Sequence, residues 1–279
     1  MKANTIKLAR DIMGNPWFVS EPEKMAALAM RFLERAPLSM EFEAEPLREL
    51  LENTAASGGK RKKCVVIPLH GTMTKYDTCE NYGTQYLADK LKAYAKDKSV
   101  AGVVLDIDSG GGSSDAVPPL IEGIKAFQAS GKPIYVHCDN CGSAAYWVAS
   151  QCDSIYMDNK MSRVGSIGAY YLMLDDTAAN PTTGERWITV YADESPDKNK
   201  AYREAIAGNE TPAKEELASL VGMFREDVLA GRPSIKSKEK GVLTGAMFHT
   251  SDAIALGMAD AMRTLDETIE AVFAISSVD

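Results

Sequence analysis

From residue 64 onward, short apolar runs of strand length alternate with stretches of helical periodicity, and this alternation most constrains the fold. Residues 100–107 are almost continuously apolar, which is typical of a strand buried on both faces. Such strands in alternation with helices predict an α/β fold with a mostly parallel sheet flanked by helices. We expect strands over 64–69, 100–107, 134–137, 154–157 and 187–191, and helices over 82–96, 117–127, 143–150, 212–229 and 252–256.

The first 60 residues have a different, helical character. Residues 20–23 read Ser-Glu-Pro-Glu, a capping box with proline in the first turn, and apolar residues then recur at helical spacing until Pro37. A second short helix is expected over residues 45–53, and the Ser-Gly-Gly break at 57–59 is the clearest boundary. We therefore expect a helical N-terminal arm and linker over 1–60, an α/β domain over 61–265 and a C-terminal helical tail over 266–279.

Charge and hydropathy exclude several classes of partner. The net charge of −8 and the pI near 5.1 argue against a nucleic-acid-binding surface. The one basic run, residues 60–63, is interpreted as a solvated linker end. No run approaches the roughly 18 apolar residues of a membrane span, and the first residues lack the apolar core of a signal peptide. These features predict a protein that works in the cytoplasm without a membrane partner.

The cysteines do not indicate a metal site. Five cysteines at irregular spacing fit a reducing compartment. Cys138 and Cys141 form a C-x-x-C pair, but a zinc site usually needs a second close pair, which the other cysteines do not supply. We expect buried or incidental thiols, and neither a metal nor a cofactor.

A glycine run, Gly110-Gly111-Gly112, is expected to form a turn between a buried strand and a helix. Glycines there allow positive φ and leave backbone N–H groups free to face an anion. The spacing fits neither a dinucleotide-binding nor a P-loop motif. Two interpretations stay open from these residues alone: one side of an oxyanion hole, or an ordinary tight turn.

Ser143 lies where a strand-like run gives way to a helix-like run, in the segment 141–146 (Cys-Gly-Ser-Ala-Ala-Tyr). Tight turns of small residues at such junctions expose nucleophiles on α/β folds, although serine is also a common helix N-cap. The three histidines, His70, His137 and His249, show no sequence signal for a catalytic base. Each is expected to be structural.

A lysine can replace histidine as the base only if its amine is neutral. Its ordinary pKa is about 10.4, so activity near pH 8 requires burial and like charge that cost about 3 to 4 kcal/mol. Lys198 and Lys200 form a cluster downstream of the segment 164–168 (Val-Gly-Ser-Ile-Gly). A serine, backbone donors and a late lysine indicate a serine-lysine hydrolase.

Taken in order, these segments resemble the signal peptide peptidase A family of serine-lysine peptidases, which share the Clp protease/crotonase fold. The resemblance covers about residues 64–262 and adds a closing element to the segments above. Clp protease carries its histidine in the segment equivalent to 165–168, where this chain has Ser166 and no histidine. The chain is therefore more similar to the serine-lysine branch. The matching segments are 108–112, 141–146, 165–168 and 241–245, followed by 252–260.

Within that branch the chain looks most like phage head (capsid) maturation proteases. The resemblance is based on Asn15-Pro16-Trp17, which precedes an expected amphipathic helix, and on the segment 67–73. The resemblance implies scaffold and capsid proteins as substrates, and the host cytoplasm or the phage prohead as the location. The chain departs from the family pattern at Gly110, where proline is usual, at Ala145, where glycine is frequent, and in a lengthened segment 191–200.

The resemblance implies endopeptidase cleavage without a cofactor, by a chain that forms homo-oligomers. It implies that Ser143 is the nucleophile, that Lys198 is the base with Lys200 as the alternative, and that Ser166 orients the lysine. The N–H groups of Gly111 and Ala144 would stabilise the oxyanion, and an extended peptide would lie near Gly112 and Gly168.

Other functions remain open. One is a cytoplasmic protease that degrades signal peptides. Another is an acyl-CoA enzyme of the crotonase type, which would use paired N–H donors on a thioester and would not need Ser143 or Lys198. The third is a non-catalytic assembly protein that keeps the fold.

Overall fold

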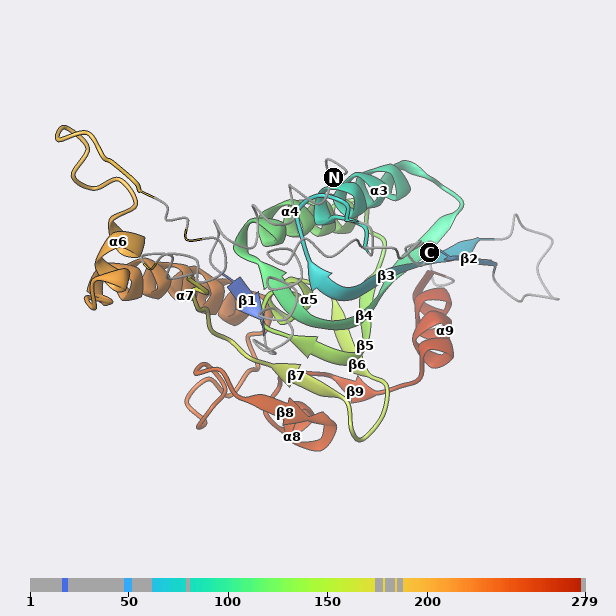
Figure 1. Cartoon of the computed structure of the whole chain (residues 1–279). Coiled ribbons are helices and arrows are strands. Elements are labelled where there is room, and N and C mark those ends of the chain that lie inside the picture. Colours follow the sequence, from blue (N-terminus) through green and yellow to red (C-terminus); the bar gives the residue numbers. More distant parts are fainter. Residues whose placement is uncertain are drawn as a thin grey trace.

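The structure is a computed structural model that describes residues 62–78, 81–173, 178, 184 and 188–276, and the backbone of 17–19 and 48–51. The described strands join in one sheet of order β2-β3-β4-β5-β6-β9, with β1 paired to β4 and β7 paired to β5 and β8 (Figure 1). The strands are β1 (Trp17–Val19), β2 (Arg48–Leu51), β3 (Lys63–Met73), β4 (Val100–Ser113), β5 (Ile134–Gly142), β6 (Ser154–Met157), β7 (Arg163–Gly165), β8 (Met247–His249) and β9 (Ala261–Met262).

Helices connect these strands and cover the sheet. Parallel neighbours need crossover connections, and α3 and α4 supply them between β3 and β4 and between β4 and β5. The helices are α3 (Thr84–Lys96), α4 (Val117–Gln128), α5 (Ala144–Ala149), α6 (Lys200–Ile206), α7 (Thr211–Gly231), α8 (Thr250–Ala255) and α9 (Leu265–Ser276), and one 3₁₀ turn, η1 (Ser114–Ala116), precedes α4.

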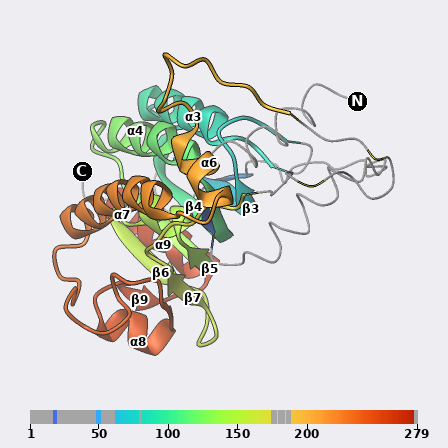
Figure 2. The same ribbon diagram turned by 60° about the vertical axis from the view of Figure 1, so that its left-hand side comes forward.

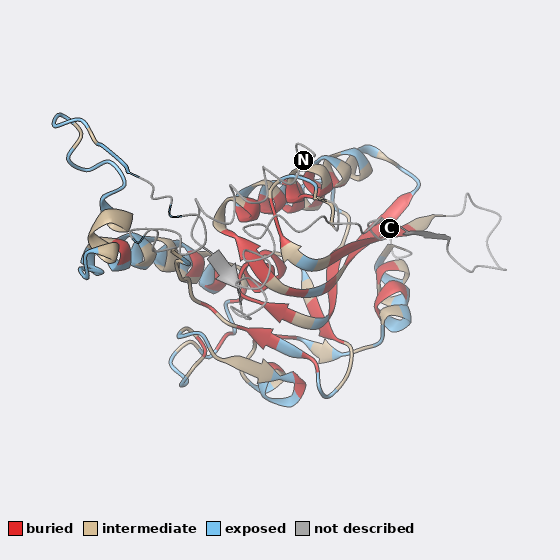
Figure 3. Ribbon diagram, in the orientation of Figure 1, coloured by how far each residue is buried: buried red, intermediate tan, exposed pale blue. Residues whose placement is uncertain are grey.

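The core has two layers, one on each face of the sheet. Successive side chains of a strand point to opposite faces. Ile107 and Cys138 therefore face the large cluster beneath α3, α4 and α5, while Val104 and Tyr135 face a smaller cluster that includes Val272 of α9 (Figures 1 and 3). Strands β3, β4, β5, β6 and β9 are parallel, so the predicted α/β fold with a mostly parallel sheet is confirmed.

Helix α6 contributes no buried residue to this core, whereas α7 packs against it through Phe224 and Val228. No residue of α6 is buried, and α7 buries only Ala213, Phe224 and Val228 along its 21 residues (Figure 3). Their exposure leaves a large surface that the described chain does not cover. In the described ranges, no helix has both the length and the apolar character that crossing a membrane requires.

One predicted helix is wrong. Residues 45–53 were expected to be helical, but Arg48–Leu51 form β2, which pairs antiparallel with Lys63–Val66 of β3. The backbone of β2 completes the hydrogen bonds of the sheet edge, and this tertiary pairing outweighs the local helical pattern. The helix expected from residue 20 to Pro37 lies outside the described residues.

Two other expectations, a turn at the glycine run and a strand over 187–191, differ from the structure. The glycine run is not a turn, because β4 continues through it to Ser113 while Thr72 and Met73 of β3 pair with Gly111 and Gly112. The strand expected over 187–191 is absent from its described residues 188–191. Ile188 and Val190 are instead 73% and 86% exposed.

Candidate active site

Ser143 occupies a strained turn between β5 and α5. Its φ is 53° and its ψ is −120°, a backbone conformation that residues other than glycine rarely adopt. The residue is only 1% exposed. Strain of this kind persists only where surrounding structure enforces it, and it gathers at functional sites. A serine on a sharp strand-to-helix turn is the geometry of a nucleophile elbow.

The turn is held by hydrogen bonds and by a fully buried helix. The Ser143 N–H donates to Gly165 O at 2.7 Å, and Ser143 O accepts from the Trp147 N–H at 2.9 Å. Every residue of α5 is buried. The Trp147 ring stacks on Phe224 of α7 with 4.6 Å between centroids, and its Nε1 donates to Asp227 at 2.8 Å. Residues on three elements, β7, α5 and α7, therefore fix the position of Ser143.

The loop after β7 lies against the serine. Gly142 pairs with Gly165, and the Ser143 hydroxyl donates to Gly168 O with 3.3 Å between the oxygens. Ser166 has a positive φ of 57°, and its N–H donates to Ala246 O at 2.8 Å. Of the predicted site residues, Ser143, Ser166 and Gly168 are thus brought into one neighbourhood.

The glycine edge of β4 lies beside this turn. Ser109 of β4 pairs with Cys141 of β5, so Gly111 follows at the level where β5 ends and turns at Ser143. The Gly111 N–H donates to Ser109 Oγ at 3.1 Å, and the Ser109 hydroxyl donates to Gly71 O at 2.5 Å. Sequence reasoning missed Ser109. No local sequence signal reports its role, because the contact with Gly71 joins residues that are far apart in the chain.

Ala144 is the first residue of α5, where the first N–H groups of a helix have no intrahelical acceptor. Its N–H therefore emerges beside the Ser143 side chain, which precedes it in the chain. The N–H of Gly111 is engaged by Ser109 Oγ in this state.

Among the residues that the structure describes, neither candidate lysine contacts Ser143. Lys198 is exposed, and Lys200 lies 3.3 Å from Asp197 with its side chain 48% exposed. The segment before α6, shown in orange, projects away from the sheet (Figures 1 and 2). Between these described residues no hydrogen bond or ion pair joins Ser143 to either lysine.

Two of the three histidines, His137 and His70, belong to a separate network around Asp106. His137 Nδ1 lies 2.8 Å from Asp106 Oδ1 and His137 Nε2 lies 3.1 Å from Asp158 Oδ1. His70 Nε2 lies 3.6 Å from the other oxygen of Asp106. Burial alone would lower the pKa of His137, but the hydrogen bonds and charges of Asp106 and then Asp158 outweigh it and raise the pKa. The ring is occupied on both nitrogens, which fits a structural role.

This network predicts a pH dependence of stability. Because the pKa of His137 is raised in the folded state, its stabilisation is fully present below its ordinary value of 6.5 and is lost as the pH rises through the folded-state value. The pKa of Asp106 is lowered: burial would raise it, but the hydrogen bonds from His137 and His70 prevail, so its contribution is lost only in acid. In urea titrations, we expect His137→Gln to remove the fall in the free energy of unfolding that accompanies rising pH. His249→Gln should retain that fall, and it serves as the control because the His249 ring hydrogen-bonds only to Met161 O among the described residues. Equal pH profiles in both variants would contradict the assignment.

The C-x-x-C thiols are buried, as expected. Cys138 and Cys141 are fully covered in β5. Burial raises the pKa of Cys141 well above its usual value, with the neighbouring Cys138 adding to the effect. A thiol of this kind is a poor nucleophile.

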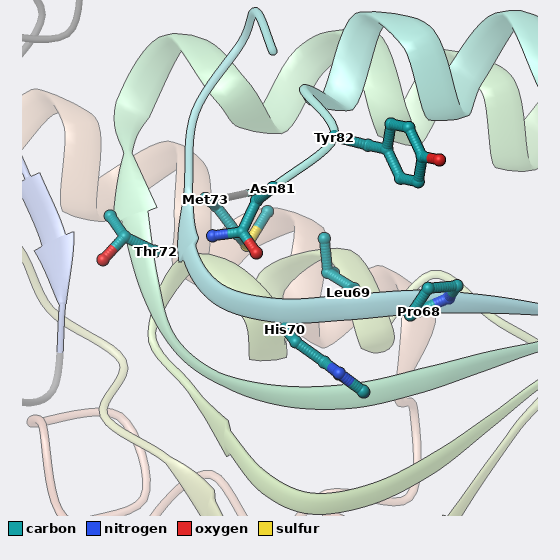
Figure 4. Close-up of a pocket in the computed structure, with 7 residues that line it drawn as sticks. All are labelled: Pro68, Leu69, His70, Thr72, Met73, Asn81 and Tyr82. Atoms are coloured by element: carbon teal, nitrogen blue, oxygen red, sulfur yellow. The ribbon is translucent and has the colours of Figure 1, made fainter. Parts of the chain in front are cut away.

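A small cavity on β3 does not extend the site. Its volume is about 20 Å³, which is of the order of one water molecule. Figure 4 shows His70 pointing to the opposite side of β3 from Asn81 and Tyr82. Thr72 and Met73 line the cavity and pair with β4 on its β3 edge, away from β5. The remaining lining residues are Pro68, Leu69, His70, Asn81 and Tyr82.

Two glycines of the predicted substrate surface differ sharply in the space around them. A Cβ on Gly112 would lie 2.0 Å from Met73 O, whereas a Cβ on Gly168 would meet nothing within 4 Å. We expect Gly112→Ala to lower the free energy of unfolding by about 3 kcal/mol, since β3 and β4 must separate. Gly168→Ala, the matched control, should stay within about 0.5 kcal/mol of wild type in the same denaturant titration. An equally stable Gly112→Ala would show that the strand contact is not tight.

The chain matches the profile described as Peptidase family S49 over residues 126–278. It is 27% identical over 213 residues to Protease 4 of Haemophilus influenzae, covering 74% of this chain and 34% of that protein. It is 22% identical over 237 residues to a protein named Putative signal peptide peptidase SppA from Enterococcus faecium, covering 80% and 67%. The chain thus spans about a third of the length of the Haemophilus relative.

Solved structures show more distant similarity. A mutant of the 1510-N membrane-bound stomatin-specific protease is 14% identical with a TM-score of 0.38, covering 74% of this chain and 82% of that one. A putative enoyl-CoA hydratase/isomerase from Acinetobacter baumannii is 13% identical with a TM-score of 0.48, covering 84% and 82%.

Proposed function

Because the chain belongs to peptidase family S49, we propose that it is a serine endopeptidase in which Ser143 is the nucleophile and a lysine is the base. The observation that carries this proposal is the buried, strained Ser143 at the β5–α5 junction, flanked by the glycine edge of β4 and the loop after β7. Its first test is hydrolysis of a pool of fluorogenic peptides by the full chain. Turnover that depends on Ser143 is expected, and a chain that cleaves none of the pool in its assembled form would overturn the proposal.

In the proposed reaction the lysine amine takes the proton of the Ser143 hydroxyl as Oγ attacks the scissile carbonyl. The Oγ–C bond forms, the carbonyl electrons move onto oxygen, and backbone N–H groups stabilise that charge. The C–N bond then breaks, and the leaving amine takes the proton from the lysine. A water molecule repeats the sequence on the acyl-enzyme and releases the acid.

The proposed oxyanion donors are the N–H groups of Gly111 and Ala144. The Gly111 N–H has Ser109 Oγ as its acceptor in this structure, so it must turn from that hydroxyl towards the substrate oxygen. Ser166, on the loop that also supplies Gly168, is proposed to orient the lysine ammonium. Both proposals follow from the closeness of these residues to the Ser143 turn.

We propose that the base reaches Ser143 only in a homo-oligomer. A lysine must be desolvated to be neutral near pH 8, and the segment around Lys198 is exposed in the single chain. The nearby Ile188 and Val190 are exposed as well, and α6 buries no residue. A neighbouring subunit would cover all of these surfaces.

This arrangement predicts that assembly and activity are lost together. We expect the double variant Ile188→Glu/Val190→Glu to dissociate in light scattering and to lose most of its peptidase activity, because both apolar side chains would lie at the contact. Met161→Glu is the matched control, since Met161 is also 73% exposed but lies between β6 and β7. A chain that is monomeric at the assay concentration and fully active would refute the oligomer.

For the substrate we propose scaffold and capsid proteins during assembly of a phage head. The support is the resemblance of Asn15-Pro16-Trp17 and of the segment 67–73 to capsid maturation proteases. The test is co-expression of the active chain with the scaffold and capsid proteins of a phage head. Cleavage of either protein, absent with the Ser143→Ala variant, is expected.

A second substrate class is favoured by one comparison. The Enterococcus relative, two thirds of which this chain covers, is named as a putative signal peptide peptidase. A synthetic signal peptide added to the same preparations distinguishes the two substrates. Rapid cleavage of that peptide with intact capsid and scaffold proteins would favour the signal-peptide role.

A further inference from the structure

The edge of β4 beside Ser143 is open to a further strand. A strand has two edges, and β3 holds one edge of Gly111 and Gly112 through Thr72 and Met73. β5 holds the other edge only as far as Ser109, which pairs with Cys141. Beyond that point β5 turns into α5 at Ser143, so the second edge of Gly111–Ser113 has no partner from the sheet core.

The strand β1 takes this edge. Trp17 pairs with Ser113, Phe18 with Gly112 and Val19 with Gly111, in antiparallel register (Figure 1). Because β3 already occupies the first edge, β1 lies on the edge that faces the end of β5. From Trp17 to Val19, β1 therefore runs from the tip of β4 towards the level of the Ser143 turn.

An extended peptide substrate would use the same edge. Peptides that add to an exposed sheet edge gain affinity from main-chain hydrogen bonds, which any sequence can make. Gly110, Gly111 and Gly112 present this edge without side chains that could obstruct a strand. Only one strand can pair with it at a time.

We propose that residues 17–19 of the chain occupy the substrate strand's place, so that the N-terminal segment blocks peptide binding until it leaves. This inference rests on the proposed function, because it takes the Gly111–Ser113 edge to be the substrate edge. The block is reversible, since three residues make few hydrogen bonds, and it is intramolecular, which raises the local concentration of the occupant.

The test removes the backbone pairing of β1 without shortening the chain. Antiparallel neighbours alternate between hydrogen-bonded and non-hydrogen-bonded pairs, so replacing two consecutive residues by proline removes a ladder donor in either register. The variant is Phe18→Pro/Val19→Pro in the full chain. The matched control is Phe18→Ala/Val19→Ala, which changes the same two side chains but keeps both N–H groups.

Two readouts separate this inference from the proposed function. The first is the rate at which a fluorophosphonate that carries an extended peptide labels Ser143. If β1 holds the edge nine-tenths of the time, the proline pair should raise this rate about tenfold, and the alanine pair should leave it near wild type. The second is amide hydrogen exchange at Gly111–Ser113 in the Ser143→Ala background, which needs no activity. The proline pair should speed exchange there.

Equal labelling rates for the proline and alanine pairs, with labelling present in both, would overturn the occupancy of the substrate edge and leave the peptidase proposal standing. Faster exchange in the proline pair without labelling of Ser143 in any variant would instead overturn the peptidase proposal, and with it the role given to β1. Equal exchange in all variants would show that β1 does not pair with this edge in solution.

Discussion

Ser143→Ala is expected to lower peptide hydrolysis by about 10⁶-fold, the cost of removing a nucleophile that acts in concert with its base. The substitution removes one oxygen from a turn that Gly165 and Trp147 hold through the backbone, so the fold should remain. The measurement is kcat/KM for a fluorogenic peptide, with circular dichroism to confirm folding. Retention of more than a few per cent of activity would exclude Ser143 as the nucleophile.

A glycine variant separates chemistry from strain at the same position. Ser143→Gly also lacks the hydroxyl, but glycine adopts a φ of 53° without the steric cost of a Cβ. We expect Ser143→Gly to be as inactive as Ser143→Ala and more stable than it by about 1 kcal/mol. If alanine were the more stable of the two, the turn would not be strained.

Lys198→Ala is expected to lower activity by about 10⁴-fold, the upper end of the range for loss of a general base. The informative comparison is Lys198→Arg, which keeps the positive charge but cannot give up its proton. If the lysine acts as a base, both variants are inactive. If it only pairs with a carboxylate, arginine restores activity.

A Lys200 variant tests which lysine is the base. The segment 191–200 is longer than the family pattern, so two lysines, Lys198 and Lys200, lie near the position where the family has its catalytic lysine. We expect Lys200→Ala to keep most of its activity, since this side chain pairs with Asp197 in solvent. An inactive Lys200→Ala together with an active Lys198→Ala would transfer the role of base to Lys200. Wild-type activity should rise with pH as the amine becomes neutral.

Much of the fold could be predicted because the local hydrophobic patterns of the sequence agree with the strand pairing and helix packing of the structure. The strand at 154–157 matches β6, and the helix over 212–229 lies within α7. Where the sequence pattern failed, a distant partner decides the conformation. β2 forms because β3 offers an edge, and the glycine run is extended because β3 pairs with it. No local signal reports such pairing.

The part of the candidate site that could be predicted is the part in which the residue type itself indicates the chemistry. A serine among small residues pointed to the β5–α5 turn, and the structure adds the strain and burial of Ser143. The role of Ser109, which holds the Gly111 N–H, was not predictable, because it depends on contact with Gly71 across the sheet. The carboxylates around His137 were missed for the same reason.

The most direct test of the serine-lysine assignment is covalent labelling of the assembled full chain with a fluorophosphonate, read by intact mass and by mapping of the modified peptide. The account predicts a single adduct on Ser143, formed at least about 100-fold more slowly in Lys198→Arg, since the base must accept the hydroxyl proton. The absence of any adduct, or an adduct on another serine while Ser143 stays unmodified, would contradict it.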